Sequence, residues 1–209
     1  MQMTDLPENI VDQVLWNKIK TGNKSCFNEL FRRYYSELYY YGIKIFSDSD
    51  FIKECIQEVF VRIWETRENL SDVQNLKSYL LVSLRRKILT AKERNMHRVE
   101  IGDIETGSFI FEENEFEQHE EISNEIRKIL LKAVNSLTRK QRELIILFFY
   151  HELSYHEIAQ VIGISVPAVR NLMYRTLVHL REILGEKSLK SMRNMFFLLF
   201  SSILIKKAD

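Results

Sequence analysis

Residues 153–174 read LSYHEIAQVIGISVPAVRNLMY, and this stretch has the pattern of a helix-turn-helix. Such a motif joins two steeply crossing helices through a tight turn, so it needs a small residue at the helix contact and a residue that tolerates positive φ in the turn. Ala159 and Gly163 stand at those positions. The apolar offsets around both helices are occupied by Ile158, Ile162, Ile164, Val169 and Leu172. The sequence therefore predicts a helix-turn-helix, with a plain helical hairpin in a bundle as the alternative.

The second helix of this motif is expected to enter the major groove of DNA, with its first turns facing the bases. Val169 and Leu172 are predicted to point inward, so the residues predicted to face DNA are Ser165, Val166, Pro167, Arg170, Asn171 and Arg175. Bidentate hydrogen bonding suits Arg170 to guanine and Asn171 to adenine. The alternative is that Arg170 and Arg175 contact only phosphates, and for Arg175 the phosphate contact is the expected one.

The start of this second helix depends on its proline. Ser165 is the apparent N-cap by residue type. Val166, however, precedes Pro167, and a residue before proline avoids helical backbone angles. We therefore expect Val166 to be the N-cap and Pro167 to occupy the first helical position, where proline is favoured.

The rest of the second half also has helical periodicity. A stripe of apolar residues predicts one helix before the motif: Ile122, Ile126, Ile129, Leu130, Val134 and Leu137. Thr138 with Gln141 forms a capping box that opens a helix through Tyr150, and Ser154 with Glu157 forms another. The last helix is predicted over 166–184, ended by Gly185. This half is thus expected to be a four-helix domain over 123–186.

The first half is predicted to be a helical bundle over residues 9–97. Apolar residues at spacings of three and four mark a long helix over 27–45, which Gly42 weakens without forbidding it, and a second helix over 52–64. A third helix is expected over 76–94 after a polar loop, and a shorter one over 10–20. The fold class is therefore all-α, with two small helical domains.

Charge is segregated along the chain, although the formal net charge is only +1. Between residues 77 and 98 there are seven basic residues and one acid, whereas residues 99–126 hold ten acids and no Lys or Arg. The second stretch contains two glycines and no sustained helical period. We therefore expect an acidic linker over 98–122. An apolar tail over 187–209 either packs on the second domain, masks it or binds a partner.

Composition and motifs argue against other classes of protein. Six Gly and two Pro disfavour an all-β fold, and 45% hydrophobic residues are enough for a core. Cys26 and Cys55 are too few for a disulfide framework and suggest a reducing cytoplasm. The start of the chain lacks a signal-peptide pattern, and the eleven-residue apolar run over 195–205 is shorter than the ~20 residues that cross a bilayer. A cytoplasmic protein is expected.

An enzyme is not expected either. His151 and His156 are five residues apart and fall on either side of a helix start, whereas a zinc-protease helix needs them four apart. The sequence contains no phosphate-binding loop, no Gly-x-Ser-x-Gly and no Cys/His ligand set. We expect no catalytic residue, cofactor, metal or small-molecule substrate.

Taken together, the order and spacing of short motifs resemble the bacterial RNA polymerase sigma factors of the extracytoplasmic function (ECF) group. The motifs of the first half are Gly22, Phe27-x-x-Leu30-x-x-x-Tyr34, Ile56-Gln57-Glu58-Val59-Phe60-x-Arg62-x-Trp64 and Tyr79-Leu80. Those of the second half are Leu137, Gln141-Arg142-Glu143, Leu153-Ser154-Tyr155-x-Glu157-Ile158-Ala159, Gly163-Ile164-Ser165, Val169, Arg175 and Leu180-Arg181.

The resemblance implies three binding surfaces. The surface for the β′ clamp helices of core polymerase would consist of Gln57, Glu58, Phe60, Arg62 and Trp64. The residues that bind and melt the −10 element would be Asn75, Lys77, Tyr79, Arg85, Arg86, Lys87, Lys92 and Arg94. The helix-turn-helix would read the −35 element. Tyr79 either stacks on an extruded base or is a core tyrosine.

The resemblance also implies partners and leaves alternatives open. Expected partners are core RNA polymerase (β′ clamp helices and β flap), promoter DNA and an anti-sigma factor, often membrane-bound. The acidic linker would thread the RNA channel of the polymerase, with a merely solvated tether as the alternative. A two-domain helix-turn-helix regulator with an N-terminal sensing or dimerising domain is the main alternative, and a protein whose basic helix binds an acidic partner is the third.

Overall fold

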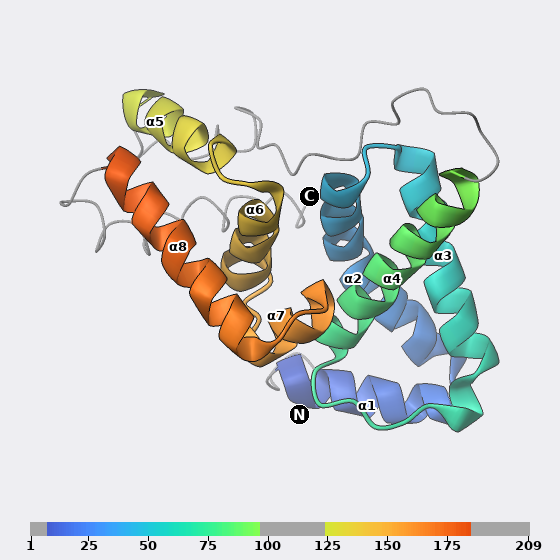
Figure 1. Cartoon of the computed structure of the whole chain (residues 1–209). Coiled ribbons are helices and arrows are strands. Elements are labelled where there is room, and N and C mark those ends of the chain that lie inside the picture. Colours follow the sequence, from blue (N-terminus) through green and yellow to red (C-terminus); the bar gives the residue numbers. More distant parts are fainter. Residues whose placement is uncertain (1–7, 97–123, 185–209) are drawn as a thin grey trace. The chain divides into compact units, whose positions relative to one another are not determined.

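The computed structural model describes residues 8–96 and 124–184, and within these ranges it contains helices, turns and loops but no strand (Figure 1). The all-α prediction is therefore confirmed. The chain divides into two compact units, Met1–Gly107 and Ser108–Asp209. That division falls inside the predicted linker, which lies outside the described residues, as does the tail over 187–209. None of the described helices combines the length and apolar character that crossing a membrane needs.

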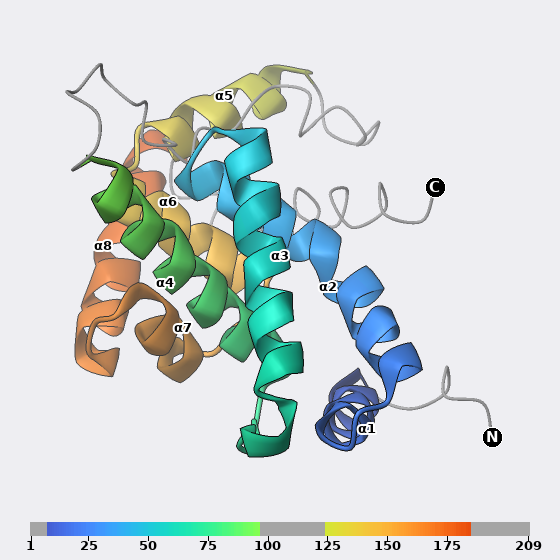
Figure 2. The same ribbon diagram turned by 90° about the vertical axis from the view of Figure 1, so that its right-hand side faces the viewer.

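Unit 1 is built from α1 (Glu8–Lys20), α2 (Lys24–Ile45), α3 (Ser49–Glu65), a short 3-10 turn (Arg67–Asn69) and α4 (Leu76–Met96). α2, α3 and α4 pack against one another, and α1 packs against α2, α4 and the 3-10 turn (Figure 2). The bundle encloses a core of large apolar side chains, among them Leu15, Ile19, Leu30, Tyr34, Leu38, Tyr41, Ile52, Ile56, Leu80, Leu84 and Ile88.

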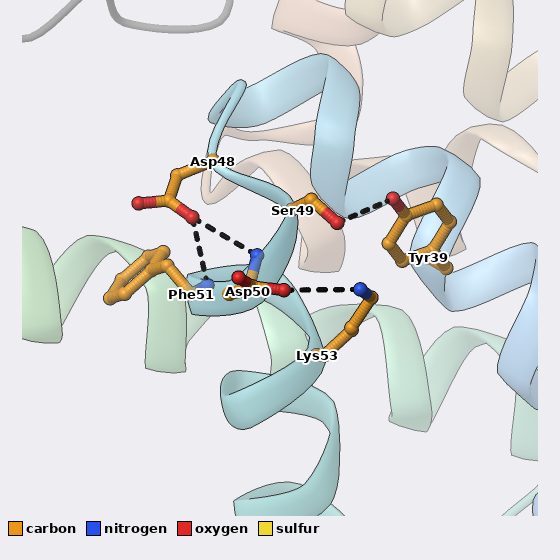
Figure 3. Close-up of polar contacts among 6 residues, drawn as sticks. All are labelled: Tyr39, Asp48, Ser49, Asp50, Phe51 and Lys53. Carbon is orange, nitrogen blue, oxygen red and sulfur yellow. Dashed lines mark hydrogen bonds and ion pairs between the residues drawn. The ribbon is translucent and has the colours of Figure 1, made fainter.

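The junction between α2 and α3 is fixed by local hydrogen bonds (Figure 3). The Asp48 carboxylate accepts hydrogen bonds from the backbone N–H groups of Asp50 and Phe51, both at 3.0 Å, and so caps α3. The hydroxyl groups of Tyr39 on α2 and Ser49 on α3 are hydrogen-bonded at 3.0 Å. The polar break that the sequence shows between the first two long helices is thus a capped turn that sets the direction of α3.

Gly42 of α2 lies in close contact with α3. A Cβ atom added to Gly42 would lie 2.6 Å from Cγ2 of Ile52 and 3.6 Å from a methyl group of Leu84. A contact of 2.6 Å is closer than packed carbon atoms tolerate, and Cγ2 sits on the stiff, β-branched part of isoleucine. The glycine that weakens α2 as an isolated helix therefore permits the packing of the bundle.

We expect Gly42→Ala to destabilise unit 1 by about 1–3 kcal/mol, the usual cost of forcing an extra methyl group into a packed core. The gain of up to ~1 kcal/mol in helix propensity offsets part of that cost. Alkylation of Cys55 during urea unfolding measures the change, because Cys55 is buried in this unit and burial raises the pKa of its thiol to about 11.

The matched control is Ser36→Ala, at an exposed position of the same helix, with an expected effect within about 0.5 kcal/mol. Adding Ile52→Leu, which lacks the Cγ2 branch, should recover part of the loss in the Gly42→Ala protein. A Gly42→Ala variant as stable as the parent would contradict the close contact.

Unit 2 contains α5 (Asn124–Asn135), α6 (Arg139–Ile145), a π-helical turn (Ile146–Tyr150), α7 (Tyr155–Ile162) and α8 (Val166–Leu184). Both predicted capping boxes are present, at Thr138 and at Ser154. The helix predicted from Thr138 through Tyr150 is instead α6 followed by the π-helical turn. Ile129 was predicted in the apolar stripe of α5, but its side chain is 50% exposed, and Leu130, Ala133 and Val134 face the core.

Candidate nucleic-acid interface

The turn between α7 and α8 has the geometry that the sequence predicts. Ala159 is buried, and its carbonyl oxygen accepts hydrogen bonds from the N–H groups of Gly163 at 2.9 Å and Ile164 at 3.1 Å. Gly163 has φ 79° and ψ 38°, the left-handed conformation that ends a helix. The N–H and side-chain hydroxyl of Ser154 both donate to the Glu157 carboxylate at 2.7 Å, so α7 is capped at both ends.

The start of α8 differs from the prediction. The Ser165 hydroxyl oxygen accepts a hydrogen bond from the N–H of Ala168 at 3.3 Å, and its carbonyl accepts one from Val169 at 3.0 Å. Ser165 is therefore the N-cap, Val166 is the first helical residue and Pro167 the second. Pro167 fits there because the first N–H groups of a helix have no acceptor within the helix, so its missing N–H loses no bond.

One face of α8 is buried, and the residues of this buried row are Val169, Met173, Thr176 and Leu180. Leu172 was predicted to point inward with Val169, but it is only half-buried. Met173 is buried beside Val169 instead. The row follows spacings of four, three and four, as a straight helix requires. The buried row holds α8 against α6 and α7, and α5 packs against α8 as well.

The opposite face of α8 is open to solvent. Pro167, Arg170, Asn171 and Arg175 are exposed there, as predicted, and Val166 is half-buried. Tyr174 is 70% exposed and was not singled out from the sequence. It follows Arg170 by four residues and Asn171 by three, which places all three on neighbouring positions of one helical face. The exposure of Tyr174 depends on how α8 packs, so no motif of the sequence identifies it.

We expect Gly163→Ala to destabilise unit 2 by about 1–2 kcal/mol, the usual cost of a left-handed backbone in a residue with a Cβ atom. No atom lies within 4 Å of an added Cβ, so the cost comes from the backbone alone. Gly163→Asn is the matched variant and should cost less, because asparagine tolerates this conformation. Hydrogen exchange of α6, α7 and α8 amides measures both effects, and equal losses in the two variants would contradict the backbone explanation.

The residues predicted to bind core polymerase lie on α3, and four of the five reach the surface. Gln57, Glu58 and Arg62 are exposed, and Trp64 is half-buried. Phe60 does not fit that prediction, because it is only 2% exposed. It belongs to the core because the buried face of α3 includes Ile56, Val59, Phe60 and Ile63.

A cluster of aromatic rings packs against the core side of this α3 surface. The Phe60 ring lies 4.9 Å from that of Phe31 and 6.0 Å from that of Phe27, and the Phe27 ring lies 5.1 Å from Trp64. The Arg67 guanidinium lies 4.8 Å from the centre of the Trp64 ring and donates a hydrogen bond to the Trp64 carbonyl at 2.9 Å. Arg67 therefore fixes the tryptophan in a cation–π contact that the sequence did not indicate.

Several residues predicted to bind the −10 element are engaged within unit 1. The Asn75 side-chain oxygen accepts a hydrogen bond from the Ser78 N–H at 2.9 Å and caps α4. Lys77 forms an ion pair at 3.6 Å with Glu37 of α2, and both side chains are mostly buried. This ion pair links α4 to α2, and the Lys77 side chain does not project from the surface.

The remaining residues of that predicted set differ in their surroundings. Arg86 is exposed, while Arg85 is half-buried. Lys87 is ion-paired with Glu58 of α3, so residues predicted for two different surfaces contact each other. The Tyr79 ring packs edge-on against Trp16 at 5.4 Å and is only half-buried, so both roles considered for it remain. The side chains of the other two, Lys92 and Arg94, lie outside the described residues.

Neither unit shows a group of side chains arranged to hold a metal ion, as far as residues 8–96 and 124–184 are concerned. His151, from the histidine pair weighed in the sequence, is buried with its ring 4.7 Å from that of Tyr150, whereas His156 is exposed on α7 and hydrogen-bonded to Gln160 at 3.2 Å. The predicted surfaces on α3 and α8 expose cations, amides and an aromatic ring, namely Arg62, Arg170, Gln57, Asn171 and Tyr174, and such groups suit macromolecular binding.

Two protein-family models match the chain. The model described as sigma-70 region 2 matches residues 30–98, and the model described as sigma-70, region 4 matches residues 127–180. Together they cover more than half of the chain. The first match falls in unit 1 and the second in unit 2.

Curated relatives extend over most of the sequence. The ECF RNA polymerase sigma-E factor of Haemophilus influenzae is 24% identical over 190 residues, which cover 87% of this chain and 97% of that protein. The protein of the same name from Escherichia coli strain K12 is 24% identical over 177 residues, covering 81% and 92%.

Solved structures show the same fold. The sigma factor RpoE of Bartonella quintana, in a co-crystal with the anti-sigma factor NepR, aligns with a TM-score of 0.52 and 21% identity, covering 76% of this chain and 96% of that one. CnrH, in complex with the cytosolic domain of CnrY, aligns with a TM-score of 0.52 and 19% identity, covering 83% and 97%. At such identities the likeness is one of fold.

Proposed function

Because the chain belongs to the sigma-70 family, as an ECF sigma factor that serves RNA polymerase in promoter recognition, we propose how its two units divide this task. Unit 1 binds core polymerase and the −10 element, and unit 2 binds the −35 element. The domain limits that we propose are 9–97 and 123–186, joined by an acidic linker over 98–122. Sigma factors are initiation factors rather than catalysts by themselves, and we propose that this one acts through binding energy alone, without a cofactor.

The observation that carries the proposal for unit 2 is the exposed face of α8. The buried row on α8 turns Arg170, Asn171 and Arg175 outward at the amino-terminal half of the helix. In a helix-turn-helix this half of the second helix meets base edges in the major groove. Arg170 and Asn171 are therefore the proposed base-reading residues, and Arg175 the proposed phosphate contact.

The exposed part of α3 supports the proposal for polymerase binding. Gln57, Glu58 and Arg62 offer polar contacts beside Trp64, whose ring is held by Phe27 and Arg67. An aromatic side chain that is held in place and surrounded by polar groups is typical of a hot spot, the part of a protein interface that contributes most of the binding free energy. Phe60 has the supporting role of holding this surface from the core side.

For the −10 element we propose a smaller set of residues than the sequence indicates. Arg86 is exposed and is the foremost described cation for a phosphate contact. Tyr79 is accessible enough to stack on a base, a contact worth ~1–3 kcal/mol. Asn75 and Lys77 act by fixing the start of α4. Lys92 and Arg94 continue the basic pattern of the sequence and stay part of the proposal.

The partners that we propose are core polymerase, through its β′ clamp helices and β flap, promoter DNA and an anti-sigma factor. The two solved structures hold a sigma factor with the anti-sigma factor NepR and CnrH with the cytosolic domain of CnrY. By analogy we propose that an anti-sigma factor, in this group often anchored in a membrane, binds this chain in the cytoplasm.

Run-off transcription on fragmented genomic DNA tests the proposed function. We expect the purified chain with core polymerase to start transcripts at defined positions that core polymerase alone ignores. Heat-denatured chain is the control. A requirement for a second sigma factor in the same reaction would instead indicate a helix-turn-helix regulator.

We expect Arg170→Ala to change base preference at one position of the −35 element, with a loss of about 1–3 kcal/mol for the favoured base. Binding to a set of −35 variants, measured by fluorescence anisotropy at fixed salt, gives this pattern. Arg181→Ala is the matched control, because Arg181 is exposed in the last turns of the same helix. An equal loss across all sequences would assign Arg170 to a phosphate instead.

A further inference from the structure

The loop before α4 is tied to α1. Residues 70–75 connect the 3-10 turn to α4 and are neither helix nor strand, so their backbone groups bond to other parts of unit 1 or to water. This loop runs along α1 before it enters α4 (Figure 1). The sigma-70 region 2 model begins at residue 30, so the match to it assigns no role to α1.

Two side chains of α1 hold the 70–75 loop. The indole Nε1–H of Trp16 donates a hydrogen bond to the Ser71 carbonyl at 3.0 Å, and Trp16 is only 2% exposed. Lys20 forms an ion pair with Asp72 at 2.6 Å, but the Asp72 side chain is 87% exposed. An ion pair in water contributes little, whereas a buried ring is fixed by the packing around it. Trp16 is therefore the stronger of the two links.

The same tryptophan contacts Tyr79. The two ring centres are 5.4 Å apart and the ring planes meet at 65°, an edge-to-face arrangement that aromatic pairs favour. Tyr79 is the fourth residue of α4 and is half-buried, so its ring packs on Trp16 while part of the side chain stays accessible. One buried side chain thus contacts both the backbone of the 70–75 loop and the ring proposed to stack on a base.

The helix that carries Trp16 is anchored in the core of unit 1 independently of the loop. Val11, Leu15 and Ile19 are buried at spacings of four along α1. Asp12 is also buried, and its carboxylate accepts a hydrogen bond from the Tyr34 hydroxyl of α2. The position of the Trp16 ring is therefore set by the bundle, and the loop and Tyr79 are placed against it.

We propose that Trp16 is a positioning residue for recognition of the −10 element: it holds the 70–75 loop and the Tyr79 ring in place, ready for an unpaired base. This inference rests on the −10 role proposed above for Tyr79. Preorganisation raises affinity, because the loop and the ring then lose less conformational freedom when DNA binds. Phenylalanine at position 16 keeps an aromatic ring in the core but lacks the Nε1–H donor to Ser71.

Binding of single-stranded DNA by the full chain with core polymerase tests this role. The probe is a short fluorescein-labelled non-template strand that carries the −10 element of a promoter mapped by run-off transcription. We expect Trp16→Phe to weaken binding about two- to tenfold, the factor that corresponds to one hydrogen bond, with unchanged affinity for core polymerase. Tyr79→Ala should weaken binding about fivefold or more, because base stacking is lost. In the Tyr79→Ala background, Trp16→Phe should have no further effect.

Ile19→Val is the matched control, because it shortens a buried side chain of the same helix and leaves the contacts of Trp16 in place. It should not change DNA binding. Hydrogen exchange of the full chain gives a readout without DNA. Amides of residues 71–79 should exchange faster in Trp16→Phe than in the parent, while α2 and α3 amides keep the parent rates.

Four results separate the alternatives. Unchanged exchange over 71–79 in Trp16→Phe would overturn the positioning role, whatever the DNA measurement gives. Equal losses from Trp16→Phe with and without the Tyr79 ring would show that Trp16 does not act through that ring. A loss with Tyr79→Ala but none with Trp16→Phe would overturn the positioning role alone. No loss with Tyr79→Ala would overturn the proposed base stacking, and this inference with it.

Discussion

The orientation of α8 depends on a buried row of four side chains, Val169, Met173, Thr176 and Leu180. Once this row is packed against α6 and α7, the positions on the other side of the helix have to face solvent, whatever their chemistry. Gly163 sets where the row begins, because its left-handed conformation ends α7 and lets Ser165 cap the next helix within two residues. The exposure of Arg170 and Asn171 is thus a consequence of apolar burial and one backbone angle.

The periodic features of the fold could be predicted from the sequence, because they depend on neighbours along the chain. The helical stripes, both capping boxes and the role of Gly163 are of this kind. Leu172 and Met173 show where such reasoning ends: both are apolar and both fall at a helical spacing from Val169, so only the packed partners decide between them. The role of Gly42 in packing could not be predicted from the sequence either, because it depends on Ile52 of another helix.

The binding surfaces were predicted less completely, because counting cations does not show which of them are paired. Lys77 and Lys87 look like neighbours of Arg86 in a basic helix, yet their carboxylate partners, Glu37 and Glu58, come from α2 and α3. Phe60 stands two residues from the exposed Glu58 on one side and from the exposed Arg62 on the other, and its place on the inward face of α3 puts it in the core. The contact of Arg67 with Trp64 and the exposure of Tyr174 are likewise encoded by no local motif.

Two modest binding surfaces are sufficient for recognition when they are joined. A bidentate contact such as arginine to guanine contributes ~1–3 kcal/mol of discrimination, and a surface ion pair ~0–1 kcal/mol, so neither unit needs a large or rigid interface of its own. A connection over 98–122 spans at most ~80 Å, which exceeds the ~70 Å of two duplex turns. Under the proposed division of promoter binding, attachment of one unit raises the effective concentration of the other, and the acids of the proposed linker are repelled by the phosphates. Near-neutral net charge and strong local charge are compatible in this chain, because basic residues gather over 77–98 and acids over 99–126.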